Sequence, residues 1–224
     1  MKAVDLVVFD MVGTTVQSSP RIPEAFTRAL ETAGVQLTPE DITSIRGKSK
    51  VAAIRELLAD RFHADDTEEL IRNTYAAFKS YLLDCYRDGP VQPIEGASDV
   101  FTWCNEEAIG IALTTGFDRD LANLIVEKLR WGDLIDTLVC NDDVAAGRPA
   151  PDLILTAMER LGYVDVPRVA SVGDTLSDLQ AGANAGVGYN IGVLSGAHSR
   201  EQLQVQPHTA LIDSVADLPG VLSE

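Results

Sequence analysis

The sequence predicts an α/β fold, in which helices cover both faces of a parallel sheet and an all-helical insertion interrupts the chain. From residue 91 onward, short apolar runs alternate with segments of helical periodicity, which is the pattern of a parallel sheet. The stretch from 18 to 90, by contrast, has helical spacing throughout. We therefore expect a core domain of residues 1–17 and 91–224 and a helical domain of residues 18–90.

Composition narrows the range of partners. The chain has 224 residues and a formal net charge of −16. Such a surface repels nucleic acid and anionic lipid, so we expect neither a nucleic acid nor a membrane as a partner. The three cysteines are far apart and odd in number, which favours reduced thiols in a cytoplasmic protein over a disulfide framework. No apolar run approaches membrane-spanning length.

The first ten residues, "MKAVDLVVFD", have a charge within the apolar run and no small-residue cleavage pattern, which predicts a strand and not a signal peptide. That strand ends at Asp10 and leads into "MVGTT". A carboxylate at a strand end, followed by Gly13 and two threonines, is suited to meet a phosphate. Val12 is unexpected there, because phosphate-ester chemistry usually needs an acidic side chain at that position.

The helical insertion lies between two breaker-rich joints, "QSSPRIP" and "GPVQPIEG". Its first helix has an apolar stripe and stops at Gly34, a typical C-cap residue. Thr38 followed by Pro39 opens a short second helix. Apolar residues spaced by three and four predict two more, and the four predicted helical segments are 22–34, 38–47, 49–62 and 66–89.

Beyond the insertion, strands and helices alternate. The predicted strands are 109–115, 136–140, 168–174, 186–194 and 209–212, and the predicted helices between them are 96–107, 118–130, 151–162 and 177–185. Ligands of such sheets bind beyond the carboxyl ends of the strands. Asp10, Thr114 and Asp174 all fall at those ends.

Three carboxylates form a candidate metal site. Asp174 and Asp178 are four residues apart in "VGDTLSD", and Asp10 comes from the first strand. Oxygen ligands in that number suit Mg²⁺, which takes its remaining ligands from water and phosphate. The alternative is that Asp174 and Asp178 only cap the following helix.

Two further segments carry candidate phosphate ligands. "LTTG" offers the hydroxyls and amides of Thr114, Thr115 and Gly116 at a strand-to-helix junction, although a strand-end threonine is often only structural. Arg148 lies in the stiff "GRP" loop just ahead of a helix. Its planar fork is able to hold a phosphoryl group or to fix a carboxylate.

Taken in order, Asp10 in D-x-x-G-T-T, Thr114, Arg148 and the G-D-x-x-x-D segment resemble the haloacid dehalogenase superfamily. The resemblance implies a Rossmann-like core, a Mg²⁺ cofactor and a nucleophilic Asp10 that forms an aspartyl-phosphate. It also implies that the helical insertion is a C1-type cap. By the same resemblance, the metal ligands are Asp10, the backbone carbonyl of Val12, Asp174 and Asp178, and two copies pair through their caps.

Two departures point to one branch of that family. The usual loop is D-x-D-G-T with a later lysine, whereas this chain has Val12 and Arg148, as phosphonatases have D-x-A-G-T-T and an arginine. The absent acid normally protonates an alkoxide leaving group, and losing it costs about 10²–10⁴ in rate. A C–P bond breaks instead toward an enamine when a lysine has first formed an imine. Such a leaving group needs no acid beside the nucleophile.

Lys50 is the candidate for that imine. In phosphonatases the Schiff-base lysine follows a cap glycine by three, and Gly47-x-x-Lys50 has this spacing. The positive end of the helix, with Arg46 and Lys48 nearby, favours the neutral, nucleophilic amine. Three alternatives stay open: a Schiff base, an anion clamp such as β-phosphoglucomutases carry at this spacing, and a solvated surface charge.

The same stretch also departs from the phosphonatases, which have Met and His where this chain has Arg46 and Ala53. The missing histidine indicates a different 2-oxo-phosphonate or another reaction, and Arg46 indicates a substrate with a second anionic group. We expect a Mg²⁺-dependent hydrolase of a small phosphonate. The alternatives are a phosphate monoester phosphatase that makes no imine, and a binding protein that has kept the fold without the activity.

Overall fold

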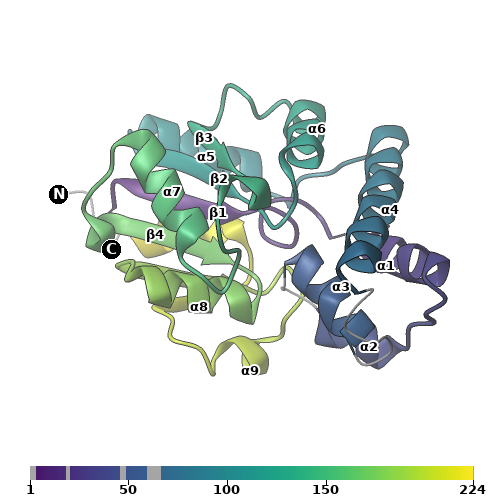
Figure 1. The fold of residues 1–224 in the computed structure, drawn as a ribbon. Coiled ribbons are helices and arrows are strands. Elements are labelled where there is room, and N and C mark those ends of the chain that lie inside the picture. The colour runs from purple at the N-terminus through teal and green to yellow at the C-terminus, as the bar shows by residue number, and fades with distance from the viewer. Residues whose placement is uncertain (1–3, 19–20, 46–48, 60–66, 224) are drawn as a thin grey trace. The chain divides into compact units, whose positions relative to one another are not determined.

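In this computed structural model, the described residues are 4–18, 21–45, 49–59 and 67–223. The chain forms two compact units (Figure 1). One, the core unit, consists of Met1–Ser18 and Val91–Glu224, and the other, the helical unit, is Ser19–Pro90. Each unit is described by itself below.

A six-stranded parallel sheet forms the centre of the core unit, with the strand order β3-β2-β1-β4-β5-β6. Its strands are β1 (Leu6–Asp10), β2 (Gly110–Thr114), β3 (Thr137–Val139), β4 (Val169–Gly173), β5 (Tyr189–Val193) and β6 (Ala210–Ile212). The first strand is central and pairs with β2 and β4, and its last residue, Asp10, lies opposite Thr114. This register brings the polar strand ends to one edge of the sheet.

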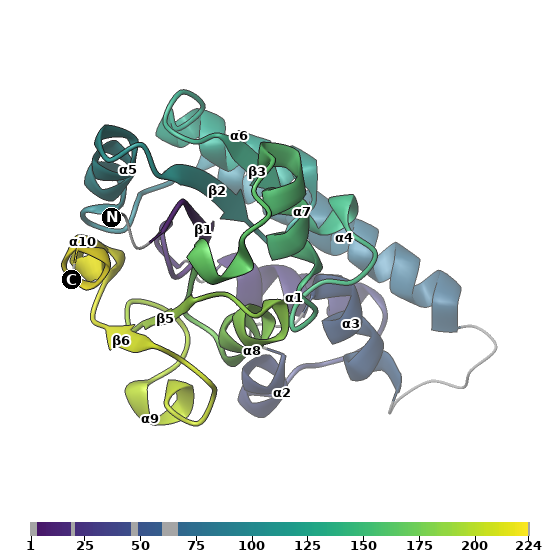
Figure 2. The same ribbon diagram turned by 90° about the vertical axis from the view of Figure 1, so that its left-hand side faces the viewer.

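Helices cover both faces of this sheet (Figure 2). In chain order they are α5 (Ala97–Glu106), α6 (Arg119–Leu129), α7 (Asp152–Leu161), α8 (Leu176–Ala185), α9 (Arg200–Leu203) and α10 (Leu218–Leu222). α5 packs against β2 and against α10, while α7 packs against β3 and β2, and α8 against β4 and β5. The sequence pattern did not predict α9 and α10, because helices of four and five residues are too short to show a periodic apolar stripe.

Burial on both faces explains why the central strands are apolar at every position. All five residues of β1 are buried. On one face, the ring of Phe9 lies 5.3 Å from that of Phe101 in α5, and Phe101 in turn lies 5.0 Å from Trp131. The opposite face packs Leu6 and Val8 against apolar side chains of α7. The sheet therefore holds the end of β1 in a fixed position.

The helical unit contains α1 (Arg21–Thr32), α2 (Pro39–Ser44), α3 (Lys50–Ala59) and the long α4 (Thr67–Asp88). α4 packs against α1 and α3, and the rings of Phe26 and Phe78 lie 4.5 Å apart between α1 and α4. Gly34 has φ +76° just beyond α1, and Thr38 caps α2 with Pro39 in the first turn, as the sequence predicted.

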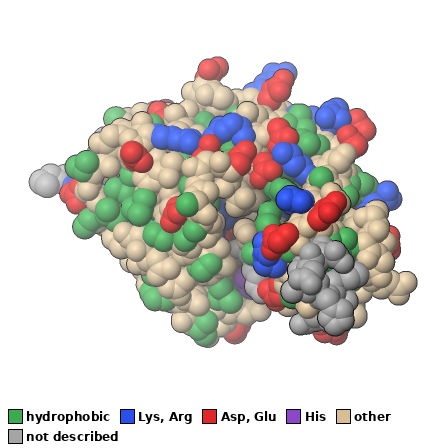
Figure 3. All heavy atoms as spheres, viewed as in Figure 1, with side chains coloured by type: hydrophobic (Ala, Val, Ile, Leu, Met, Phe, Trp, Pro, Cys, Tyr) green, Lys and Arg blue, Asp and Glu red, His purple; other side chains and the backbone are tan. Residues whose placement is uncertain are grey.

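The core unit's two segments next to the helical unit lie side by side. The amide of Gln17 donates to the carbonyl of Gln92 at 2.9 Å, and that of Ile94 donates to the carbonyl of Thr15 at 2.8 Å. The chain thus leaves the core unit and re-enters it at one place. Within the described residues, no helix combines the length and the hydropathy that crossing a bilayer requires. Acidic and basic side chains are interspersed on the face shown in Figure 3.

Candidate active site

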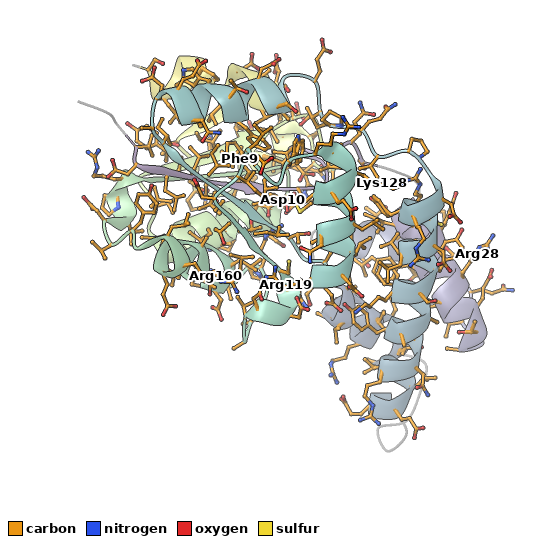
Figure 4. The ribbon with its side chains drawn as sticks, turned by 90° about the horizontal axis from the view of Figure 1, so that it is seen from above. Phe9, Asp10, Arg28, Arg119, Lys128 and Arg160 are labelled. Atoms are coloured by element: carbon orange, nitrogen blue, oxygen red, sulfur yellow. The ribbon has the colours of Figure 1, made fainter. Side chains whose placement is uncertain are left out.

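Three carboxylates meet at the carboxyl edge of the core sheet. Asp10 ends β1, Asp174 follows β4, and Asp178 lies in the first turn of α8. Each offers an oxygen, and these oxygens lie within 4.8 Å of one another. The residues are 7%, 1% and 4% exposed, respectively. Figure 4 shows Asp10 at the end of its strand, next to Phe9.

A tight turn follows Asp10. The Met11 carbonyl accepts from the amides of Thr14 at 3.2 Å and Thr15 at 2.8 Å. Gly13 has φ +100°, and a Cβ at this position would overlap the carboxylate of Asp174. The Thr14 hydroxyl donates to Asp174 Oδ1 at 3.2 Å. The glycine thus allows the turn to approach Asp174 closely, and Thr14 ties the ends of β1 and β4 together.

Asp178 uses its two oxygens differently. Its Oδ2 accepts from the amide of Thr175 at 2.9 Å and from the Thr175 hydroxyl at 2.5 Å, which completes a capping box at the start of α8. Its Oδ1 lies 2.6 Å from Nη1 of Arg148. The helix-capping interpretation of Asp178 is therefore correct for one oxygen, while the other faces the carboxylate cluster.

Arg148 joins the cluster to β2. Its Nη1 donates to Asp10 Oδ1 at 2.5 Å, and its Nη2 donates to the Thr114 hydroxyl at 3.3 Å. That hydroxyl donates in turn to the carbonyl of Phe9 at 3.2 Å. The guanidinium therefore contacts Asp10, Asp178 and Thr114 at once, which the single ammonium of a lysine is poorly shaped to do.

Burial dominates the electrostatics of the site. It raises the pKa of Asp10 to about 6, although the Arg148 charge opposes this rise. Burial, and then the charges of Asp10 and Asp178, raise the pKa of Asp174 well above its usual range. Burial alone would lower the pKa of Arg148, but the Asp10 and Asp178 carboxylates outweigh it and raise that pKa. Arg148 therefore remains charged.

This charge balance fits a divalent cation. Three carboxylates face the one guanidinium that contacts them in the part of the chain described, so ionising all three would leave two negative charges in a buried place. Uncompensated buried charge is costly, and a cation held by carboxylate oxygens and water removes that cost. The residues present thus suit Mg²⁺.

A second cluster of acidic residues in the core unit differs from the Asp10 cluster in its charge balance. Cys140, Asp142 and Asp143 also lie close together. Asp143, however, pairs with Arg119 of α6 and, at 3.0 Å, with Arg160 of α7, and Figure 4 shows these two arginines near each other. Its charge is already compensated, so this group joins helices to the sheet.

Thr115 and Gly116 differ from Thr114. The Thr115 amide donates to the carbonyl of Val139 at 3.1 Å, and its hydroxyl accepts from the amide of Phe117 at 3.2 Å. Both groups thus stabilise the β2 loop itself. Gly116 lies in open space, because a Cβ added there would meet no atom within 4 Å.

Of the predicted residues in the helical unit, Lys50 is described and is the first residue of α3. The amide of Ala52 donates to the Ser49 hydroxyl at 3.3 Å, so Ser49 opens the helix as predicted. Ala53, which stands where phosphonatases have a histidine, is fully buried. Arg46, Gly47 and Lys48 lie outside the described residues.

The loop after β5 also reaches the site, which the sequence did not reveal. The Ser195 hydroxyl donates to the carbonyl of Gly13 at 2.8 Å, and the amide of Ala197 donates to Asp174 Oδ2 at 2.6 Å. Small residues in "LSGAHS" carry no signal of chemistry. The only feature of the sequence that indicates a role in the site is that these residues directly follow a predicted strand, at the edge of the sheet where ligands bind.

Comparison with known proteins identifies the family of the chain. The model of the haloacid dehalogenase-like hydrolases matches residues 4–186, which is most of the chain. This chain belongs to the haloacid dehalogenase-like hydrolases. It is 32% identical to the phosphonoacetaldehyde hydrolase of Bacillus cereus (strain B4264) over 205 residues, which cover 87% of this chain and 77% of that enzyme.

Two solved structures share the fold of this chain. A phosphonoacetaldehyde hydrolase-like protein from Oleispira antarctica superposes with a TM-score of 0.86 at 24% identity, covering 99% of this chain and 92% of that one. A predicted phosphoglycolate phosphatase from Haemophilus somnus 129pt superposes with a TM-score of 0.82 at 15% identity, covering 99% of both chains. The fold is thus common to proteins named for phosphonate and for phosphate-ester substrates.

Proposed function

We propose that this haloacid dehalogenase-like hydrolase cleaves the C–P bond of a small 2-oxo-phosphonate, with Mg²⁺ as cofactor and Asp10 as nucleophile. The observation that carries the phosphoryl-transfer part is the buried group of Asp10, Asp174 and Asp178 with Arg148 against two of them. The name of the Bacillus cereus relative supports the phosphonate part.

Asp10 attacks phosphorus through a carboxylate oxygen. With a pKa of about 6, this carboxyl is largely ionised at neutral pH, as a nucleophile must be. Arg148 donates to its Oδ1 and so fixes the orientation of the carboxylate. In this proposal, Arg148 and Thr114 also stabilise the charge that develops on the phosphoryl oxygens during transfer.

Asp10, Asp174 and the backbone carbonyl of Val12 would hold the Mg²⁺ ion, and Asp178 would orient its surroundings. When bound, the ion neutralises negative charge on the carboxylates and on the phosphoryl group. The chain's own contribution is to hold these oxygens at one edge of the sheet, through the Thr14–Asp174 and Thr175–Asp178 hydrogen bonds.

Val12 is what favours phosphonates over phosphate esters, because an ester's alkoxide needs an acid at this position. We infer that the Lys50 amine condenses with the substrate carbonyl, with loss of water, to give an imine. The electron pair of the C–P bond then moves onto carbon, giving an enamine, while Asp10 takes the phosphoryl group. Water releases phosphate from Asp10 and hydrolyses the imine that forms when the enamine is protonated.

Ala53 favours a second candidate, a phosphate monoester phosphatase with the same nucleophile and no imine. Phosphonatases have a histidine at this position, and here a buried alanine supplies no proton donor. In that case Lys50 clamps an anionic group, and the substrate has a good leaving group or supplies its own proton.

A substrate screen separates the two. 2-Oxoalkylphosphonates and phosphate monoesters are offered with Mg²⁺ to the wild type, Lys50→Arg and Asp10→Asn, with Lys79→Arg in α4 as the matched control. The proposal predicts that Lys50→Arg loses phosphonate cleavage alone and that borohydride with substrate labels Lys50 irreversibly. The phosphatase would be established if esters are turned over without labelling of Lys50 and if Lys50→Arg lowers turnover of both substrate classes by the same factor. Wild-type turnover no higher than that of Asp10→Asn would exclude both.

A further inference from the structure

The loop that follows β5 makes contacts with both loops that carry the carboxylates. Ser195 donates to the carbonyl of Gly13 in the turn after β1 at 2.8 Å. Two residues on, the amide of Ala197 donates to Asp174 Oδ2 at 2.6 Å. The next residue, His198, accepts from the amide of Leu176 at the start of α8 at 3.3 Å. One short loop thus connects the turn after β1 with the segment between β4 and α8.

Between these contacts, Gly196 lies directly against Asp174. A Cβ built on Gly196 would overlap the Asp174 carboxylate, so only glycine permits this approach. Gly196 has no positive φ, and hence the requirement is for space and not for an unusual backbone conformation. The atoms in the way are Oδ2, Cγ and Cβ of Asp174, so a larger residue at 196 would displace the whole Asp174 side chain or the loop itself.

The hydrogen bonds of Asp174 indicate what the loop does. Oδ1 accepts from the Thr14 hydroxyl and Oδ2 from the Ala197 amide. A carboxylate offers about four lone-pair directions, so each oxygen keeps one for a cation. Together, the two donors fix the direction in which those remaining lone pairs point. Hydrogen bonds to the ligands of a metal site commonly hold those ligands in the orientation that binds the metal.

We propose that Ser195, Gly196 and Ala197 are positioning residues for the metal site: they hold Asp174 and the turn that contains Val12 and Gly13 in the geometry that binds Mg²⁺. Ser195 acts on the Val12 side, because its partner carbonyl belongs to the residue after Val12. Gly196 and Ala197 act on Asp174. This inference rests on the Mg²⁺ site of the proposed function.

The test measures Mg²⁺ binding and needs no substrate. Metal-free wild type, Ser195→Ala and Gly196→Ala are titrated with MgCl₂, and the rise in unfolding temperature gives a dissociation constant for each. Ser199→Ala is the matched serine control, because Ser199 lies in the same segment but caps α9. Gly132→Ala is the glycine control, because a Cβ there meets no atom within 4 Å.

We expect Gly196→Ala to weaken Mg²⁺ binding about tenfold or more. Ser195→Ala, which removes one neutral hydrogen bond, should weaken binding roughly twofold to tenfold. Both controls should keep the wild-type constant, even though Ser199→Ala loses stability. A wild-type constant in folded Gly196→Ala would overturn the inference, and if that variant does not fold, a wild-type constant in Ser195→Ala overturns it instead. Absence of any Mg²⁺ response in the wild type would refute the metal part of the proposed function, and this inference with it.

Discussion

At the scale of single residues, Arg148 shows how one side chain organises the site. Its guanidinium contacts Asp10, Asp178 and Thr114, which come from β1, α8 and β2. The stiff loop around Arg148 led to the prediction that its guanidinium holds a phosphoryl group or fixes a carboxylate. The sequence did not predict which carboxylates the guanidinium contacts. Asp10 lies 138 residues away in the sequence, and only the order of the strands in the sheet brings it next to Arg148.

Replacing Arg148 tests this arrangement. Arg148→Lys keeps the charge but not the fork, so we expect kcat to fall about 10-fold to 100-fold. Arg148→Met removes the charge as well, and we expect a fall of roughly 10²–10³. Steady-state kinetics with the best substrate of the screen measures both. Arg160→Lys, a change of the same kind at an arginine that pairs with Asp143, should leave kcat unchanged. The role of Arg148 would be contradicted if Arg148→Lys, Arg148→Met and Arg160→Lys all had the same kcat.

The cysteines differ in environment and hence in reactivity. Burial raises the pKa of both Cys104 and Cys140 to about 12, whereas Cys85 is partly exposed. At pH 8 we expect one thiol, Cys85, to react quickly with a disulfide reagent and two to react only after unfolding. A thiol whose pKa is raised by folding ionises first in the unfolded chain. The stability contributed by Cys104 and Cys140 should therefore fall as the pH rises above about 9.

Thiol counting with and without denaturant checks the first expectation, and denaturant unfolding between pH 8 and pH 10 checks the second. Cys85→Ser is the control that should remove the fast phase alone. Three fast thiols in the native protein would contradict the burial of Cys104 and Cys140.

At the scale of elements, the sequence predicted most of the framework. Apolar runs predicted all six strands, most plainly β1, β2 and β4, because strands covered on both faces must be apolar throughout. Caps such as Thr38 and Gly34 fixed helix ends because their mechanism is local. The sequence analysis missed the loop after β5. This loop contacts Asp174 through the backbone amide of Ala197 and through Gly196, which has no side chain, and neither contact is evident from the residue types.

Two capping boxes allow a matched test of α8. Thr38 caps α2 with Asp41, and Thr175 caps α8 with Asp178. Replacing either threonine by alanine should cost about 1 kcal/mol of stability. Thr175→Ala alone should also weaken Mg²⁺ binding, because Asp178 loses the donors that hold its Oδ2. Denaturant unfolding and MgCl₂ titration measure the two effects. An equal Mg²⁺ response in both variants would show that the cap of α8 and the metal site are independent.

At the scale of the whole molecule, the two units suggest that the core folds by itself. The sheet, its helices and all three carboxylates belong to the core unit. The segments that lead to the helical unit are joined by backbone hydrogen bonds between Gln17 and Gln92 and between Thr15 and Ile94. A short turn is therefore able to close the chain there at small entropic cost.

We expect a chain in which a linker of about five glycines and serines replaces residues 19–90 to unfold cooperatively and to respond to Mg²⁺ as the full chain does. It should not cleave phosphonates through an imine, since it lacks Lys50. Circular dichroism, thermal unfolding and MgCl₂ titration measure these properties. A linker of the same length placed at residue 205, in an exposed position after α9, controls for the insertion itself. A core that does not fold would contradict the independence of the two units.

The most direct test of the account is to capture the phosphoryl group on Asp10. The wild type is mixed with its best substrate and Mg²⁺, quenched in acid during turnover, reduced with borohydride and digested for mass spectrometry. An aspartyl-phosphate is reduced to homoserine, so we predict that residue in the peptide around position 10 of the wild type and no turnover by Asp10→Asn. Rapid turnover with Asp10 unmodified, and activity retained in Asp10→Asn, would contradict the account.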